Sequence, residues 1–205
     1  RDGSPPARLR RERLGQLGDL VRARADDFAE AISTDFGNRA RFETALLETQ
    51  VLMSAIRHAR RNVRYWMQPS HREVDFAFWP GSALVRREPL GVVGIVSPWN
   101  YPLQLALSPL VDALAAGNRA ILKPSEQTPV FSDLLKRAIA EVFAEDVVAV
   151  VTGGPDVAAA FTKLPFDHLV FTGSTSIGRR VAQAAAEGLV PTTLELGGKS
   201  PAVLC

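Results

Sequence analysis

From residue 92 onward, short β-branched runs alternate with helical segments, and this alternation restricts the fold more than any other feature of the sequence. Five runs have the length and composition of buried strands, namely Val92–Ser97, Ala120–Leu122, Val147–Val151, His168–Thr172 and Thr192–Leu196. The segments between them have helical apolar spacing: Leu103–Ala116, Pro129–Phe143, Asp156–Thr162 and Ser176–Glu187. Parallel strands need such crossovers. We therefore predict an α/β fold with a doubly wound parallel sheet, whose ligand crevice lies at the carboxyl ends of the strands.

Two longer helical patterns precede this region. Apolar residues at helical spacing predict amphipathic helices over Pro6–Ser33 and Phe42–Met67, followed by an irregular, Pro-containing stretch over Gln68–Gly81. The second pattern places four guanidinium groups on one helix face, those of Arg57, Arg60, Arg61 and Arg64. We interpret this face as solvated or in contact with a subunit, because no aromatic residues interleave it as in a nucleic-acid site. Residues 1–80 are thus expected to pack on a domain formed by residues 81–205.

Composition excludes several classes of protein. The chain has 205 residues, of which 46% are hydrophobic, so it can bury a core. Its net charge is +2 and the basic excess is confined to the first 72 residues, which argues against a nucleic-acid partner. No apolar run reaches the ~20 residues that span a bilayer. A single cysteine, Cys205, excludes a disulfide framework and a Cys-based zinc site, so we expect no metal and a reducing, cytoplasmic location.

The first motif that can carry chemistry is the sequence Ser97-Pro98-Trp99-Asn100-Tyr101-Pro102, at the end of the first predicted strand. Two prolines stiffen this turn. Asn100 could therefore aim its side-chain N–H at an oxyanion, a contribution worth about 10²–10³ in rate. The alternative is a structural Pro-rich turn that buries Trp99.

The second motif, Lys123-Pro124-Ser125-Glu126, ends the next strand. A carboxylate in this place can accept the ribose hydroxyls of an adenosine and disfavours a 2′-phosphate, and Lys123 could donate to the same sugar. The alternative is a surface loop in which Ser125 and Thr128 cap the following helix.

The third motif runs from Phe171 to Gly178 and leads from a strand through a glycine turn into a helix. Backbone N–H groups and the helix dipole form an anion site there, suited to a cofactor pyrophosphate. The spacing is neither G-x-G-x-x-G nor a P-loop, since Arg179 stands where a P-loop has Lys. By itself this turn is weak evidence.

The fourth motif, Thr193 to Lys199, places Glu195 among apolar neighbours at a strand end. Burial would raise the pKa of this carboxyl toward the range of a general base, and Gly197-Gly198 would let a ligand approach the backbone. The alternative is a Glu paired with Lys199.

The four motifs, in this order, resemble the NAD(P)-dependent aldehyde dehydrogenase superfamily. The stretches Gly91–Pro102, Val150–Gly154 and Leu194–Pro201 resemble its class 3 branch, while Ser33–Asn38 and Ile56–Arg61 resemble coniferyl aldehyde dehydrogenases. The resemblance covers nearly the whole chain. It implies N-terminal helices followed by a Rossmann-like sheet, as in a truncated aldehyde dehydrogenase fold.

The resemblance also implies a reaction and a set of roles. An aldehyde, either coniferaldehyde or another aromatic or medium-chain one, is oxidised to the acid: a cysteine thiolate adds to the carbonyl, hydride passes to the nicotinamide, and water hydrolyses the thioester. The acceptor would be NAD, with NADP as the alternative. Asn100 would donate to the oxyanion, and Glu195 would be the general base. A homodimer is expected for the full-length enzyme. The residues that would bind the cofactor are Ser97, Trp99, Lys123, Glu126, Gly153, Phe171, Gly173, Ser174, Thr175, Ser176, Ile177, Gly178 and Leu196.

One departure from the family bears on activity. The family's nucleophilic cysteine lies a few tens of residues beyond the E-L-G-G-K motif, whereas this chain continues only ten residues past Glu195. We expect a fragment that is inactive alone, in which Cys205 is a structural strand residue and the Ser82–Glu88 strand lacks its partner. The alternatives are a short protein that binds NAD or a partner without catalysis, and a thiol enzyme that uses Cys205.

Overall fold

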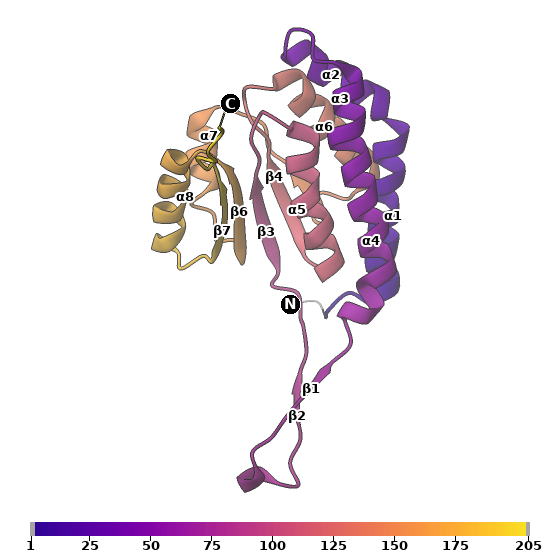
Figure 1. Cartoon of the computed structure of the whole chain (residues 1–205), viewed down its shortest axis with the longest axis vertical. Coiled ribbons are helices and arrows are strands. Elements are labelled where there is room, and N and C mark those ends of the chain that lie inside the picture. Colours follow the sequence, from indigo (N-terminus) through magenta and orange to yellow (C-terminus); the bar gives the residue numbers. More distant parts are fainter. Residues whose placement is uncertain (1–2, 204–205) are drawn as a thin grey trace.

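A five-stranded parallel sheet forms the centre of the molecule (Figure 1). The computed structural model describes residues 3–203. The strands lie in the order β5-β4-β3-β6-β7, with bounds β3 Val92–Val96, β4 Arg119–Lys123, β5 Val148–Val150, β6 His168–Gly173 and β7 Thr192–Leu196. The predicted α/β class and parallel sheet are confirmed, and each strand lies within one residue of its predicted bounds at either end.

The path of the chain through the sheet determines where a ligand can bind. From the central β3 the chain proceeds outward through β4 to β5, and then crosses back to β6 on the other side of β3. Val96 at the end of β3 is paired with Lys123 of β4 on one side and with Phe171 of β6 on the other. The strand order therefore reverses beside β3, which opens a crevice at the carboxyl ends of these strands.

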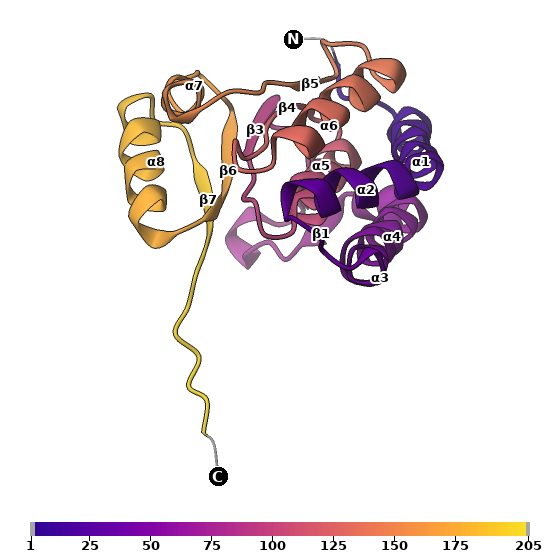
Figure 2. The same cartoon turned by 90° about the horizontal axis from the view of Figure 1, so that it is seen from above.

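Helices cover both faces of the sheet (Figure 2). One face packs against α5 (Pro102–Ala116) and α6 (Pro129–Val142), and the other against α7 (Pro155–Phe161) and α8 (Thr175–Glu187). The N-terminal helices form a further layer outside α5 and α6, and the buried residues of these two layers form one continuous core with β3, β4 and β5. The face under α7 and α8 has its own smaller core around Phe161, Phe166 and Leu169.

The prediction of one helix over Pro6–Ser33 is wrong, because the chain turns at Arg24 and forms α1 (Ala7–Ala23) and α2 (Ala25–Asp35). The turn lays α2 against α6, where Phe28 contacts the ring of Phe131 at 5.9 Å between centroids. Tertiary packing thus overrides a continuous helical pattern. The second predicted helix is continuous and consists of α3 (Arg41–Thr44), a π-helical turn η1 (Ala45–Thr49) and α4 (Gln50–Trp66). Its four arginines are exposed.

Charged side chains of the N-terminal helices form hydrogen bonds with the free main-chain groups at the ends of α5 and α6. Arg10 is buried, and its Nη1 donates to two carbonyl oxygens in the last turn of α5, at 2.6 and 3.1 Å. Asp35, at the end of α2, accepts from the N–H groups of Val130 and Phe131 at the start of α6, at 3.1 and 2.9 Å. Arg10 thus satisfies carbonyl groups at the end of α5, and Asp35 satisfies N–H groups at the start of α6, next to the loop that precedes it.

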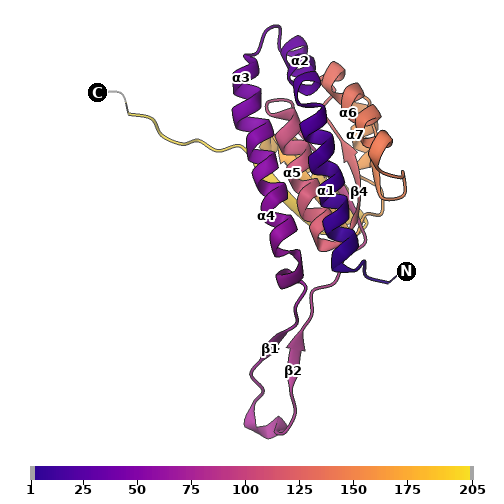
Figure 3. The ribbon, with the colours of Figure 1, turned by 90° about the vertical axis from the view of Figure 1, so that its right-hand side faces the viewer.

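A β-hairpin projects from the body of the molecule (Figures 1 and 3). Strand β1 (Ser70–Arg72) pairs antiparallel with β2 (Ala83–Val85), and η2 (Phe76–Phe78) lies at the tip. The stretch that we predicted to be irregular thus contains the partner of the predicted Ser82–Glu88 strand, and the expectation that this partner is missing is wrong. The strand β1 has no alternating apolar pattern, which is why the sequence did not indicate it.

After β7 the chain extends away from the body, and residues 197–203 are exposed (Figure 2). Cys205 lies outside the described residues. Within residues 3–203, none of the helices is both long and apolar enough to cross a membrane.

Candidate functional site

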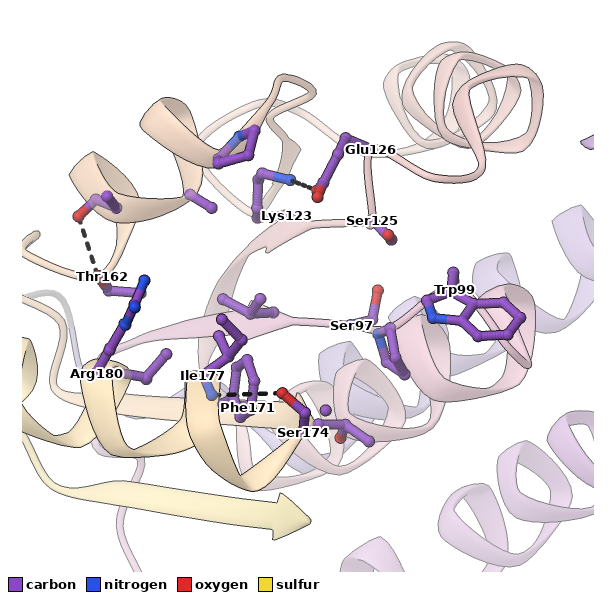
Figure 4. Close-up of a pocket in the computed structure, with 18 of the residues that line it drawn as sticks. Ser97, Trp99, Lys123, Ser125, Glu126, Thr162, Phe171, Ser174, Ile177 and Arg180 are labelled. Carbon is purple, nitrogen blue, oxygen red and sulfur yellow. Dashed lines mark hydrogen bonds and ion pairs between the residues drawn. The ribbon is translucent and has the colours of Figure 1, made fainter. Parts of the chain in front are cut away.

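A cavity of about 660 Å³ lies at the carboxyl ends of β3, β4 and β6, with α7 and α8 as its walls (Figure 4). Its volume is within the roughly 300–1,000 Å³ typical of small-molecule sites. Three of the four sequence motifs contribute to it. The structure brings together Ser97, Trp99, Lys123, Glu126, Phe171, Gly173, Ser174 and Ile177 as lining residues.

The end of β3 contributes a buried hydroxyl group and an aromatic ring. Ser97 is 4% exposed, and its Oγ has no hydrogen-bond partner within residues 3–203. A buried hydroxyl group without a partner fits a site that a polar ligand completes. Trp99 is half exposed and contacts Phe36 at 5.9 Å between ring centroids, so it is not the buried structural Trp of the alternative interpretation.

The end of β4 contributes a cation and a carboxylate. Lys123 is 1% exposed; its Nζ donates to the Pro124 carbonyl at 2.8 Å and lies 3.5 Å from Glu126 Oε2. The side chain of Glu126 is 41% exposed and lines the cavity. A donor and an acceptor side by side match the needs of a ribose diol.

The helix-cap alternative for this loop is met only in part. Ser125 Oγ accepts from the Gln127 N–H at 3.2 Å. Thr128 makes no side-chain cap to α6, because Asp35 takes that place from another helix. The start of α6, which follows this loop, is therefore capped by Asp35 of α2, and Glu126 has no part in the cap.

The N-terminus of α8 faces the same cavity. Ser174 is the N-cap, and its Oγ accepts from the Ile177 N–H at 3.4 Å. The N–H groups of Thr175 and Ser176 have no partner in the described part of the chain, and both residues are exposed. Free N–H groups and the positive end of a 13-residue helix form an anion site.

At two glycines of the expected set, an added Cβ would lie closer to a neighbouring side chain than a normal contact. A Cβ on Gly173 would lie 2.6 Å from the ring of Phe171, and one on Gly178 would lie 2.6 Å from Leu196. Leu196 thus packs α8 against β7 and supports the cavity wall from behind. Gly153 has a φ of +149°, a conformation that L side chains rarely adopt. Gly153, Thr175, Ser176, Gly178 and Leu196, also expected at the cofactor, are not among the residues that line the cavity.

Sequence reasoning missed the parts of the wall formed by helix faces. Pro155, Ala158 and Ala159 on α7 and Thr162 just after it recur at helical spacing, and Arg180, Val181 and Ala184 on α8 extend the wall from the predicted Ile177. Figure 4 shows Arg180 on the wall opposite Glu126. A helical projection of the segments after the glycine turns could have found these residues.

Asn100 lies beside this cavity rather than in it. It lines a neighbouring hollow of about 340 Å³, together with Phe36, Arg39 and Tyr101. Its side chain is exposed, and its carbonyl oxygen accepts from Arg39 Nη1 at 2.6 Å.

Glu195 lies near the end of β7, paired in register with Thr172 of β6. The expectation that it is buried is wrong: Glu195 is exposed, because β7 is an edge strand of the described sheet. Within residues 3–203 no ion pair joins it to Lys199, so the paired alternative is not realised either.

Comparison with known proteins identifies relatives of this site and fold. The aldehyde dehydrogenase family model matches residues 3–205. A probable coniferyl aldehyde dehydrogenase of Pseudomonas aeruginosa is 52% identical over 98% of this chain and 42% of its own length. Human aldehyde dehydrogenase family 3 member B1 is 39% identical over 96% of this chain and 42% of its own.

Solved structures agree in fold. A substrate-bound Staphylococcus aureus AldH matches with a TM-score of 0.92 and 38% identity, over 96% of this chain and 43% of its own. A Mycobacterium tuberculosis aldehyde dehydrogenase complexed with NAD+ matches with a TM-score of 0.84 and 34% identity, over 96% and 40% respectively. The chain spans about two fifths of the length of these relatives.

Proposed function

Because the chain belongs to the aldehyde dehydrogenase family, we propose that it forms the cofactor-binding part of an enzyme that oxidises an aldehyde to the carboxylic acid, with NAD as acceptor. The observation that carries this proposal is the cavity at the reversal of the strand order, where three separate sequence motifs meet. In this account residues 81–205 form the cofactor domain, and the helices of residues 1–80 pack on it.

The cofactor roles follow from the donors and acceptors around the cavity. Lys123 and Glu126 hold the adenosine ribose, since their head groups lie 3.5 Å apart at the rim. The N-terminus of α8, with Ser174 as its cap, receives the pyrophosphate. The unpartnered Ser97 hydroxyl group supplies a further polar contact. NAD is favoured over NADP because Glu126 would repel a 2′-phosphate.

The bound cofactor supplies hydride-acceptor chemistry, and the residues of this chain orient and polarise the reactants. Asn100 donates from its side-chain amide to the oxyanion, the former aldehyde oxygen, that forms when the thiolate adds to the carbonyl carbon. Glu195 takes a proton from the attacking thiol or water. Glu195 is exposed in the described residues, so water can reach the carboxylate.

The substrate, partner and location are further parts of the proposal. The Pseudomonas relative's name supports an aromatic aldehyde such as coniferaldehyde. We place the enzyme in the cytoplasm as a homodimer, and cell fractionation with light scattering tests both assignments.

The test compares this chain with the complete gene product that contains it. We expect the complete protein to reduce NAD with coniferaldehyde, and the 205-residue chain to bind NAD without reducing it, because the nucleophilic cysteine comes from elsewhere. NAD reduction by the chain alone contradicts the division of labour. Failure of the complete protein to oxidise any aromatic or medium-chain aliphatic aldehyde contradicts the activity itself.

A further inference from the structure

One arginine outside the cofactor cavity is buried between aromatic rings and carboxylates, instead of extending into solvent. Arg39 lies in the loop between α2 and α3, and its side chain is 6% exposed. Its guanidinium carbon lies 4.9 Å from the ring centroid of Phe36 and 4.5 Å from that of Tyr101. A flat cation held between two aromatic rings is restricted in position and orientation.

The same guanidinium group connects the loop that precedes α5, at Asn100, to the carboxylates of Glu43 and Glu48. Its Nη1 donates to the Asn100 carbonyl oxygen at 2.6 Å and lies 3.5 Å from Glu48 Oε1, while Nη2 donates to Glu43 Oε1 at 3.0 Å. Charge-assisted bonds of this kind are roughly twice as strong as neutral ones. The arginine therefore holds the main chain of Asn100 from the helical layer.

Glu48 binds the chain just after Asn100, at the start of α5. It is fully buried in the π-helical turn, and its Oε2 accepts from the N–H groups of Leu103 and Gln104, at 2.8 and 3.1 Å, where α5 begins. Single π turns inside helices occur frequently at functional sites. Arg39 and Glu48 thus form hydrogen bonds to the main chain on both sides of Tyr101-Pro102.

The side chain of Asn100 has no such support of its own. It is exposed, and within residues 3–203 it makes no hydrogen bond. The main chain that carries it therefore fixes only the place from which the amide reaches out. We propose that Arg39 is a positioning residue, which fixes the Asn100 main chain and thereby keeps the Asn100 amide within reach of the oxyanion.

This inference rests on the proposed function, and its test separates the two. In the complete protein, Arg39→Met removes the donors and the charge, and Arg39→Lys keeps the charge without the planar fork. Arg10→Met is the matched control, because Arg10 is also buried and donates to the far end of α5. The measurements are kcat for aldehyde oxidation, the NAD dissociation constant and amide hydrogen exchange of residues 99–104.

We expect Arg39→Met to lower kcat about tenfold to a hundredfold, the effect of a misplacement of roughly 1 Å, with NAD affinity unchanged within about twofold. Arg39→Lys restores part of this loss, and exchange of residues 99–104 rises in Arg39→Met alone. Arg10→Met lowers the thermal midpoint without lowering kcat.

Equal loss of kcat in Arg39→Met and Arg10→Met, or unchanged exchange of residues 99–104 in Arg39→Met, overturns the inference. The exchange measurement does not depend on turnover. A complete protein that lacks turnover contradicts the proposed function, and the exchange of residues 99–104 still decides the role of Arg39.

Discussion

Lys123 Nζ and Glu126 Oε2 lie 3.5 Å apart at the rim of the cavity, with the ammonium buried and the carboxylate 41% exposed. The buried lysine has its position fixed by the Pro124 carbonyl, whereas the carboxylate is open to an incoming sugar. This pair combines a fixed donor with an accessible acceptor, so the two residues can be tested for separate contributions to cofactor choice.

Glu126→Gln should raise the use of NADP relative to NAD in the complete enzyme. The substitution removes the charge that repels a 2′-phosphate and leaves Lys123 able to attract it. The ratio of kcat/KM for the two cofactors measures the effect. Glu145→Gln, which changes an exposed carboxylate away from the cavity lining, is the control and should leave the ratio unchanged. An unchanged ratio in Glu126→Gln counts against the ribose role.

Gly173→Ala should weaken NAD binding, because its Cβ would lie 2.6 Å from the Phe171 ring that lines the cavity. Gly154→Ala is the matched control, since a Cβ there has no atom within 4 Å and the residue has an ordinary φ of −77°. Calorimetric titration with NAD compares the two. Equal affinities in both variants would show that the wall at Gly173 yields without disturbing the ligand.

Asp35→Ala should lower the free energy of unfolding by about 0.5–2 kcal/mol, the usual effect of losing a helix cap. Asp35 accepts two N–H groups at the start of α6, whereas Asp19, in an exposed pair with Arg22, supplies the control Asp19→Ala. Urea denaturation gives both values. A loss no larger than that of the control would mean that α6 does not depend on this cap.

Glu48 makes the stability of the fold dependent on pH. Burial raises the pKa of its carboxyl above the ordinary 4.5, although the N–H groups of Gln104 and Leu103 and the charge of Arg39 oppose the rise, and Glu43 adds to it. Between the unfolded and folded pKa values the folded chain binds the proton more tightly. The free energy of unfolding therefore falls as the pH rises from about 4.5 through that window.

Glu48→Gln removes this dependence, since the amide does not titrate. Urea denaturation at several pH values from about 4 upward measures the difference in free energy of unfolding between the two proteins. We expect the unsubstituted protein to lose stability relative to the variant as the pH rises. A difference that is constant with pH would contradict a raised pKa for Glu48.

Glu195→Gln should slow hydrolysis of the acyl intermediate in the complete enzyme and leave NAD affinity nearly unchanged, because the general base acts on water rather than on the cofactor. Rapid-quench kinetics measures the rate of hydrolysis, and titration with NAD measures the affinity. Parallel losses of affinity and hydrolysis would indicate a structural carboxylate.

The sequence predicts the parallel sheet because short runs rich in apolar and β-branched residues alternate with helical segments, and parallel strands need such crossovers. It predicts Ser97, Lys123 and Ser174 in one site because each follows a strand, and strand ends meet at one edge of a parallel sheet. It does not predict the turn at Arg24 or the Arg39–Glu48 pair. The turn at Arg24 depends on the packing of α2 against α6, and the Arg39–Glu48 pair depends on contacts with Asn100 and the start of α5; both sets of partners are distant in the sequence.

The prediction that Glu195 is buried is wrong for a related reason. Apolar neighbours in sequence indicate a strand, but whether that strand is covered depends on what lies beyond the edge of the sheet. The order of the strands, and so the edge position of β7, is a property of the topology.

Titration of the 205-residue chain with NAD tests the central claim most directly. The account predicts saturable binding of one NAD per chain, with a dissociation constant within about 1 μM–1 mM, weakened by Gly173→Ala and retained in Gly154→Ala. A chain that unfolds cooperatively but shows no saturable binding of NAD or NADP would contradict the assignment of this cavity to a dinucleotide.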